Sequence, residues 1–225
     1  MQIEESEQEK LILKVVEEYL NKNRYFDMSE ILPFIISRFR MSSVDINIRK
    51  IEEILRTLVK KKIIVEGSKL INSDILTNPK RKRIYDHILE NPGIYFNRFL
   101  KELDISNHVV VWHLNVLVKF NYIKKEKFDN HDVYFDSKFD LKNSKFTYII
   151  SKDKSKKIIN YLKENDFGIT KTQLSKSLKM HSNTISKYLK LFEQFNIVVK
   201  RKSSKRIIYF LNDTYMKNYL NTNDT

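Results

Sequence analysis

The stretch NHVVVWHLNVLVKFNYI, residues 107–123, decides the fold of this chain, because residues 182–198, SNTISKYLKLFEQFNIV, repeat its apolar pattern. In both stretches apolar side chains recur at i, i+4 and i+7, which is the spacing of one buried helix face, and a β-rich stretch follows. The matched apolar positions are Ile51, Leu55, Leu58 and Ile64 in a first copy, then Val110, Leu114, Leu117, Ile123 and Tyr134, and then Ile185, Leu189, Phe192, Val198 and Tyr209. A chain that builds one unit three times is expected to recognise surfaces rather than to catalyse a reaction.

The first copy is expected to be helical with a weak β-ribbon. Its predicted elements are helices over residues 7–22, 28–41 and 46–62 and a strand-like segment over residues 63–65. The second helix is expected to be interrupted or to begin anew near Pro33, because proline removes a backbone N–H from the hydrogen-bond ladder. The pattern stops around residues 73–78, and Pro79 then opens a new helix at the position where a missing N–H costs least. The first domain boundary is therefore predicted near residue 78.

The second and third copies are expected to share one order of elements. The second is predicted to have helices over residues 80–90, 97–103 and 107–120 and a ribbon over residues 123–135. The third is predicted to have helices over residues 154–164, 171–178 and 182–195 and a ribbon over residues 198–210. The connector between them carries an apolar patch at residues 146–150, which is typical of a strand. The chain is thus predicted to be mainly α with small β-hairpins (α+β) and to divide into domains at residues 1–78, 79–140 and 141–225.

Helix, tight turn, helix and β-hairpin, in this order, make a winged helix-turn-helix. The motifs are Asn91-Pro92-Gly93, Phe99-Leu100-Lys101-Glu102-Leu103, the turn Ile105-Ser106, then His113-Leu114-Asn115-Val116-Leu117 and the ribbon end Val133-Tyr134-Phe135. With them the chain resembles the winged-helix transcriptional regulators common in archaea, related to the ArsR and MarR groups. The resemblance covers the second and third copies well and the first mainly through its third helix. It implies three tandem winged helix-turn-helix domains and DNA binding, with the second helix of a motif in the major groove and the wing against the backbone or minor groove.

The positive charge of the chain lies mainly in its last third. Residues 141–225 hold 18 of the 42 basic side chains and 6 of the 28 acidic ones, and so supply +12 of the net charge of +14. Binding to a phosphate backbone favours this asymmetry. The alternative is codon bias, since the chain has no alanine and much Lys, Ile and Asn. Such a bias would enrich lysine everywhere, yet residues 1–75 carry 13 basic and 13 acidic side chains. Double-stranded DNA is therefore the expected partner.

The third copy presents side chains that suit DNA. With its core positions at 185, 189 and 192, the outward positions of its long helix hold small hydrogen-bonding groups and two cations. The ribbon tip that follows has five cations in seven residues. Such a run is often a solvated turn, but the adjoining polar helix favours phosphate contact. The predicted DNA-binding residues are Ser182, Asn183, Thr184, Ser186, Lys187 and Lys190 on the helix and Lys200, Arg201, Lys202, Lys205 and Arg206 on the wing.

The second copy is poorly suited to be the main DNA-binding domain. Val111 and Trp112 stand where the third copy has Ser186 and Lys187, and its wing tip, residues 128–132, is acidic. An exposed apolar pair marks a contact surface. We therefore expect Val111 and Trp112 to form a protein interface, covered by the connector, by another domain or by a second subunit.

The first copy has Glu52 and Glu53 at the same two positions, which would place carboxylates against a DNA groove. This favours an architectural, dimerising or ligand-sensing role. The basic tetrad at residues 80–83 begins a helix, where cations oppose the helix dipole. It is interpreted as solvated, with a phosphate contact as the alternative.

No pattern of residues points to catalysis. The chain has no cysteine, its five histidines include no i, i+4 pair, and three glycines in all cannot form a phosphate-cradling loop. We expect no enzyme activity, no cofactor and no metal. The acidic N-terminus differs from a signal peptide and no apolar run is long enough to span a membrane, so the expected location is cytoplasmic and nucleoid-associated.

Two functions remain open. The first is a DNA-binding transcriptional regulator, in which the third winged helix binds duplex DNA and a homodimer or another protein is a possible partner. The alternative is a protein-assembly subunit, similar to the tandem winged-helix components of endosomal sorting complexes or of the general transcription machinery. The charge of residues 141–225 favours the first function. The acidic and apolar faces of the first two copies favour the second.

Overall fold

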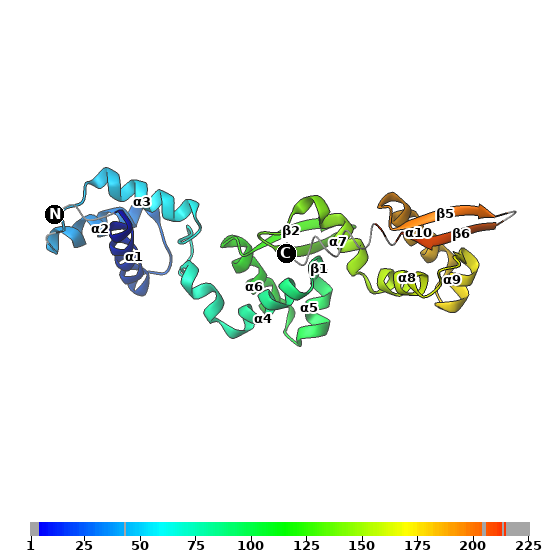
Figure 1. Ribbon diagram of the computed structural model, residues 1–225. Coiled ribbons are helices and arrows are strands. Elements are labelled where there is room, and N and C mark those ends of the chain that lie inside the picture. Colours follow the sequence, from blue (N-terminus) through cyan, green and yellow to red (C-terminus); the bar gives the residue numbers. More distant parts are fainter. Residues whose placement is uncertain (1–4, 43, 204–205, 213, 215–225) are drawn as a thin grey trace. The chain divides into compact units, whose positions relative to one another are not determined.

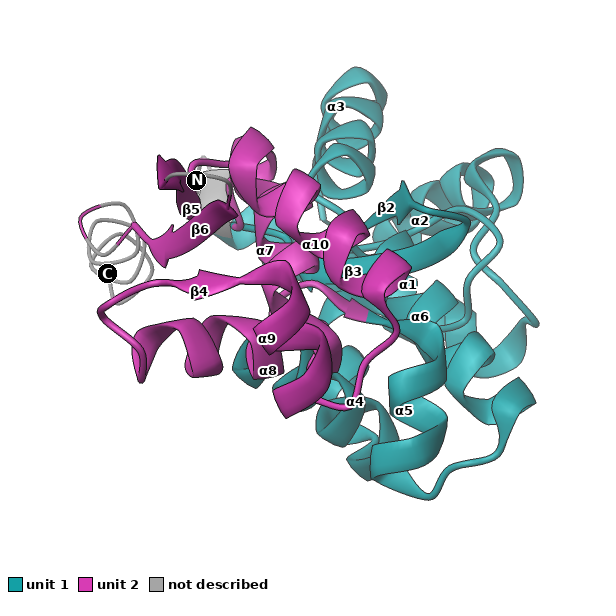
Figure 2. Ribbon diagram, turned by 90° about the vertical axis from the view of Figure 1, so that its right-hand side faces the viewer, with its two compact units in different colours: residues 1–90, 95–138 teal, residues 91–94, 139–225 magenta. Residues whose placement is uncertain are grey.

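The computed structural model describes residues 5–42, 44–203, 206–212 and 214 and is mainly helical with two small antiparallel sheets (Figure 1). The α+β class predicted from the sequence is therefore confirmed. The chain forms two compact units, one of residues 1–90 with 95–138 and one of residues 91–94 with 139–225 (Figure 2). The division into three domains stays a prediction. Within the described ranges, no helix is long and apolar enough to cross a membrane.

The first copy consists of the helices α1 (Glu5–Lys22), α2 (Met28–Met41) and α3 (Ile48–Lys60), followed by the 3-10 helix η1 (Asn72–Thr77). The predicted interruption at Pro33 is wrong, since α2 runs through this residue. The buried face formed by Ile31, Ile35 and Phe39 holds α2 together across the missing hydrogen bond. The predicted strand at residues 63–65 is reduced to a single bridge between Ile64 and Ile71. The pairing ends there because η1 begins at Asn72, directly after Ile71.

The second copy has the order helix, helix, helix, hairpin. It contains α4 (Pro79–Glu90), β1 (Ile94–Tyr95), α5 (Phe96–Leu103), α6 (Asn107–Lys119), β2 (Ile123–Phe128) and β3 (His131–Asp136). The hairpin pairs Ile123 with Asp136 at its base and Phe128 with His131 at its tip. Asp129 and Asn130 both have positive φ, as a two-residue hairpin turn requires.

The connector is helical where a strand was predicted. Residues 146–150 lie in α7 (Ser144–Ser151), and Phe146, Tyr148 and Ile149 are buried. Four consecutive buried positions, 146–149, do not alternate as a half-buried strand would, and this packing overrides the β preference of the residue types. A Cβ on Gly93 would lie 3.1 Å from the Tyr148 nitrogen, so glycine allows the close approach of the two segments.

The third copy repeats the order of the second. It contains α8 (Asp153–Lys163), β4 (Ile169–Thr170), α9 (Lys171–Ser177), α10 (Ser182–Gln194), β5 (Val198–Ser203) and β6 (Arg206–Leu211). Its sheet has the order β4-β6-β5, as the second copy has β1-β3-β2. The described parts of β5 and β6 form the wing.

Backbone details recur at the spacing of the sequence pattern. Lys62, Asn121 and Asn196 have φ values of 58°, 58° and 55°, and each follows the third helix of its copy. After each of them, the next N–H donates to a carbonyl five residues back, from Ile63 to Leu58, from Tyr122 to Leu117 and from Ile197 to Phe192. This is the hydrogen bonding of a helix C-terminus closed by a left-handed residue. The apolar positions matched in the sequence are all buried except Tyr209, which is half-buried.

Candidate nucleic-acid interface

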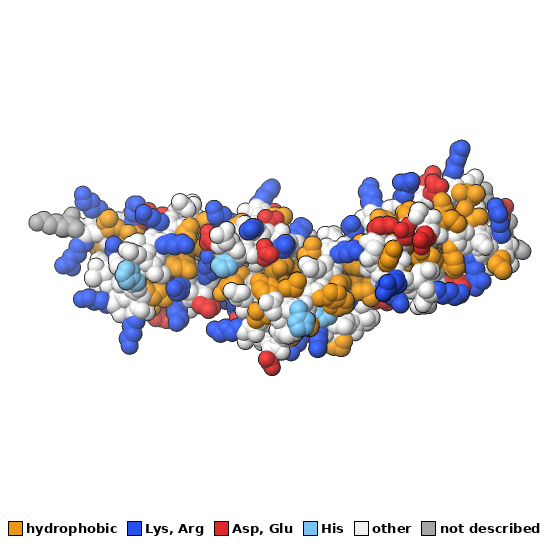
Figure 3. Space-filling view, turned by 180° about the vertical axis from the view of Figure 1, so that it is seen from behind, with side chains coloured by type: hydrophobic (Ala, Val, Ile, Leu, Met, Phe, Trp, Pro, Cys, Tyr) orange, Lys and Arg blue, Asp and Glu red, His pale blue; other side chains and the backbone are white. Residues whose placement is uncertain are grey.

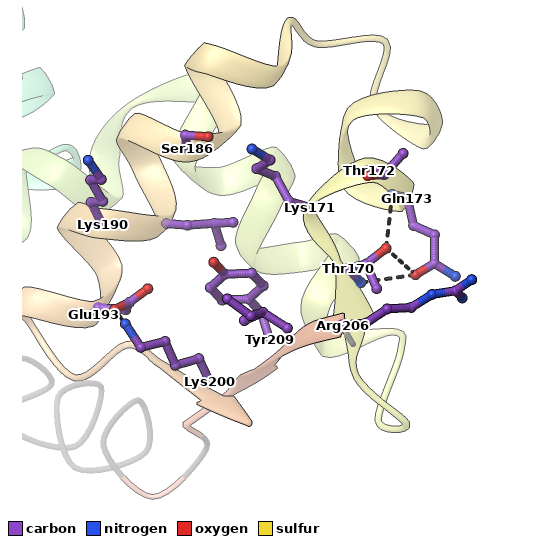
Figure 4. A pocket seen from close by; sticks show the side chains of 12 residues that line it. Thr170, Lys171, Thr172, Gln173, Ser186, Lys190, Glu193, Lys200, Arg206 and Tyr209 are labelled. Atoms are coloured by element: carbon purple, nitrogen blue, oxygen red, sulfur yellow. Dashed lines mark hydrogen bonds and ion pairs between the residues drawn. The ribbon is translucent and has the colours of Figure 1, made fainter. Parts of the chain in front are cut away.

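A groove of about 930 Å³ lies between α10, the start of α9 and the wing (Figure 4). Among the described residues, four cationic side chains line it: Lys171 on α9, Lys190 on α10, and Lys200 and Arg206 on the wing. Ser186 and Tyr209 supply hydroxyl groups between them. The groove is therefore a concave surface of positive charge with hydrogen-bonding groups, the chemistry that recognises a phosphate backbone.

The helix α10 presents a polar face because its apolar positions are all used by the core. Ile185, Leu189 and Phe192 are buried. The helix begins at an N-cap in which the His181 Nδ1 accepts a hydrogen bond from the Asn183 N–H at 3.2 Å. Beyond the groove, a shallower hollow of about 470 Å³ lies along the helix and is lined by Asn183, Ser186, Lys187, Lys190, Leu191 and Gln194. Ser186 and Lys190 line both hollows and so form the ridge between them.

The pleat of the wing separates its cations onto two faces. Lys200 pairs with Tyr209 and Lys202 with Ile207, and both partners line the groove. Arg201 pairs with Ile208 on the other face, where its guanidinium lies 4.9 Å from the centre of the Phe210 ring. Figure 4 shows the Arg206 side chain extending away from Tyr209. Lys200 therefore lines the groove, and Lys202 lies on the same face of the hairpin, whereas Arg201 lies on the other face.

One carboxylate lies among the groove cations. The Lys200 Nζ donates to the Glu193 Oε2 at 2.6 Å, and this pair raises the pKa of Lys200 above its ordinary value. Burial raises the pKa of the Tyr209 hydroxyl, so Tyr209 stays neutral near pH 7 and can donate a hydrogen bond. Glu193 thus neutralises part of the positive charge that the groove presents.

The structure brings some of the predicted residues together and leaves others apart. Ser186, Lys190, Lys200 and Arg206 line the groove, and Asn183 and Lys187 line the neighbouring hollow. Ser182 and Thr184 are half-buried and line neither hollow, while Arg201 and Lys202 are exposed on the wing. Lys205 lies outside the described residues.

Sequence reasoning missed the wall of the groove that α9 supplies. Thr170, Lys171, Thr172 and Gln173 line this wall. The Thr170 Oγ1 accepts from the Gln173 N–H at 3.3 Å, and the Gln173 Oε1 accepts from the Thr170 N–H at 2.9 Å. This is a capping box, and the spacing of Thr170 and Gln173 is its signal in the sequence.

In the second copy, the helix equivalent to α10 presents an apolar pair. Val111 is 40% exposed and Trp112 53% exposed. Figure 3 shows one face of the molecule, on which hydrophobic side chains reach the surface between the cations. A contact of Val111 and Trp112 with a separate molecule stays a prediction.

Arg81 is the exception within the basic tetrad. It was interpreted as solvated or phosphate-binding, but it is only 2% exposed, and its Nη1 donates to the Ile75 carbonyl at 2.8 Å. The guanidinium lies 5.2 Å from the centre of the Trp112 ring. Burial lowers the pKa of Arg81, the negative charge of Asp74 opposes this shift, and the Trp112 ring and the Ile75 carbonyl contact the buried guanidinium. The earlier interpretation is wrong because a neighbouring aromatic ring and a helix end enclose this one side chain.

Comparisons with known proteins identify a helix-turn-helix domain in the chain. Residues 78–145 match a family model described as the HVO_0163 N-terminal HTH domain. Over 171 residues, which are 75% of this chain, the sequence is 29% identical to an "uncharacterized HTH-type transcriptional regulator" of Methanocaldococcus jannaschii. The chain covers 43% of that relative, less than half of its length. These matches confirm the resemblance to archaeal winged helix-turn-helix regulators.

The matched segment spans α4 to β3 and is therefore the second copy. The groove lined by cations lies in the third copy, outside this segment. The family match therefore does not bear on the groove of the third copy.

Proposed function

We propose that the protein is a DNA-binding transcriptional regulator with three tandem winged helix-turn-helix domains, residues 1–78, 79–140 and 141–225, and that the third domain binds duplex DNA. The observation that carries this proposal is the groove between α10 and the wing, into which three separate segments direct cations. The excess of positive charge in residues 141–225 supports the same assignment.

In this proposal α10 enters the major groove and the wing contacts the backbone. Asn183, Ser186 and Lys187 lie on the outer side of α10, where an amide, a hydroxyl and an ammonium group can reach base edges. Lys171 and Lys200 line the groove on the other side of the ridge and would pair with phosphates, as would Lys202 on the same face of the wing as Lys200. Lys190 lies on the ridge between the two hollows and could contact either a base edge or a phosphate. The regulator would be associated with the nucleoid.

The first two domains arrange the third in this proposal. In the first, Glu53 is exposed at the position equivalent to Trp112, and Lys50 lies 3.8 Å from it. A carboxylate at this position opposes phosphate binding. In the second, the exposed Trp112 occupies the position that Lys187 holds in the third. An architectural or dimerising role suits both surfaces.

The test is the salt dependence of binding by the full chain to random duplex DNA. A contact with roughly five phosphates predicts a slope of log K against log salt near −4.5. The double variant Lys190→Ala and Lys200→Ala should make this slope shallower by about one to two units. The matched control is Lys163→Ala, which removes an exposed lysine from α8 outside the groove. A flat salt dependence, or an equal effect of the control, would contradict the proposal.

A second candidate function is that of a protein-assembly subunit, and the exposure of Trp112 favours it. The two candidates differ in their response to the groove variants. An assembly subunit would keep its function when Lys190 and Lys200 are replaced and lose it when Trp112 is replaced.

A further inference from the structure

The outward face of α6 is a continuous stripe that bears no acidic or basic charge for most of its length. Its exposed residues are Asn107, His108, Val111, Trp112, Asn115, Val118 and Lys119. These positions are three, four and seven residues apart and so lie on one side of the helix. Val118 is 38% exposed, so the apolar surface extends over two turns. Lys119 stands at the C-terminal end, and Asp104 is exposed in the turn before the helix.

The stripe is unsuited to phosphate. His108, Val111, Trp112 and Asn115 occupy the positions that Asn183, Ser186, Lys187 and Lys190 occupy in α10. Both lysines of α10 are therefore replaced by neutral side chains, and the tip of the hairpin that follows α6 carries acidic residues. An apolar surface flanked by polar residues fits a protein partner better than a nucleic acid.

The Trp112 side chain is held before any partner arrives. The Arg81 guanidinium lies over one part of the ring, and the His113 ring meets it at 4.8 Å in an edge-on arrangement. Arg81 is itself fixed by its hydrogen bond to the Ile75 carbonyl. A large aromatic side chain with a fixed rotamer loses little entropy on association, which is a property of interface hot spots.

We infer that this stripe binds a second copy of the same chain, with the two α6 helices antiparallel across a two-fold axis between Val111 and Trp112. In this register each of these residues meets its own counterpart. His108 lies opposite Asn115 of the second copy, and Lys119 lies opposite Asp104 of the second copy. The stripe is thus complementary to itself in charge: a neutral centre meets a neutral centre, and each cation meets a carboxylate. The antiparallel arrangement also places each helix C-terminus beside the N-terminus of the other.

The dimer would determine the symmetry of the proposed DNA site, but its formation does not depend on DNA binding. Two chains related by a two-fold axis carry two third copies, so the DNA site would consist of two inverted half-sites. The dimer itself forms through apolar contacts and should persist at salt concentrations that release DNA. Failure of the DNA proposal and failure of the dimer can therefore be distinguished.

The first test uses the absence of cysteine from the chain. Val111→Cys places a thiol beside its symmetry mate, and mild oxidation should convert most of the protein into a disulfide-linked dimer. The control is Leu89→Cys, which replaces another apolar side chain of similar exposure, 45%, at the end of α4. Equal crosslinking of the two variants, or none from Val111→Cys, would overturn the inference.

The second test exchanges the charges at the ends of the stripe. Asp104→Lys or Lys119→Asp should each weaken dimerisation about tenfold, as measured by sedimentation equilibrium, because two like-charge pairs arise in each dimer. The variant that carries both changes should regain the affinity of the unaltered protein. A double variant as weak as the sum of its parts would contradict the antiparallel register.

Trp112→Glu separates the possible occupants of the stripe. A dimer interface predicts a dissociation constant raised about thirtyfold or more, with an unchanged circular dichroism spectrum and unchanged DNA affinity per third copy. A protein that sediments as a monomer before the change overturns the inference. So does a variant that loses DNA affinity while its mass stays the same, since the stripe would then bind DNA.

Discussion

The Lys200 ammonium group lies 2.6 Å from the Glu193 Oε2, within the groove that Ser186 and Lys190 line. Phosphate must compete with this carboxylate for Lys200. Glu193→Gln removes the competitor and keeps the shape of the side chain. We expect DNA affinity to rise about fivefold on all sequences and the salt slope to steepen by up to about 0.9, because one more cation becomes available. Fluorescence anisotropy at several salt concentrations measures both. Unchanged or lower affinity would show that the pair is not part of the DNA surface.

The pleat of the wing predicts unequal roles for two adjacent cations. Lys202 lies on the same face of the hairpin as the groove residue Lys200, whereas Arg201 stacks on Phe210 on the other face. Lys202→Ala should lower affinity for random DNA several-fold and make the salt slope shallower by about one unit. Arg201→Ala should have a smaller effect on the slope. The reverse order would mean that the opposite face of the wing meets the backbone.

Two glycines with similar backbone angles provide a matched test of packing in the third copy. Gly168 has φ of +78°, and a Cβ there would lie 2.5 Å from Ile208 and Phe210. Gly67 has φ of +65°, and its nearest neighbour would be 3.8 Å away. We expect Gly67→Ala to cost about 1 kcal/mol in unfolding free energy through backbone strain alone and Gly168→Ala about 2–4 kcal/mol, since overpacking is added. Chemical denaturation of both variants measures the difference. Equal losses would show that the wing moves aside without cost.

Burial of His113 predicts a loss of stability in mild acid. Burial, and then the charges of Arg81 and Lys80, lower the pKa of His113 below its ordinary value of 6.5. As the pH falls through 6.5, His113 becomes protonated in the unfolded chain but stays neutral in the folded chain. The free energy of unfolding therefore decreases. Above about pH 7 both states are neutral at this residue, and its contribution is constant.

His113→Gln removes the titrating group, and urea denaturation at pH 7.5 and 5.5 provides the measurement. The variant should lose less stability between these two pH values than the unaltered protein does. Other groups that titrate in this range contribute equally to both proteins. A larger loss in the variant would contradict a lowered pKa for His113.

The sequence predicted the helices of the second and third copies because their apolar periodicity is a local property. Ile185, Leu189 and Phe192 are buried as the spacing indicates. It did not predict α7, because Phe146, Tyr148 and Ile149 are residue types that favour strands, and only tertiary packing makes this segment helical.

The candidate site was predicted on α10 and the wing and missed on the α9 side of the groove. The outward positions of α10 follow from its core positions, so Ser186 and Lys190 could be named. Lys171 comes to the groove from α9, and no local pattern links it to the wing. The burial of Arg81 depends likewise on Trp112, a residue 31 positions away in the sequence.

Site-directed photo-crosslinking distinguishes DNA binding by the third copy from DNA binding by the second. Asn183 on α10 and His108 on α6 occupy equivalent positions in their helices and are both exposed. Each is changed to cysteine in the cysteine-free chain, labelled with the same photoreactive group and irradiated with saturating duplex DNA. Crosslinks to DNA are expected from position 183, with background levels from position 108. Crosslinks from position 108 that equal or exceed those from position 183 would contradict DNA binding by the third copy.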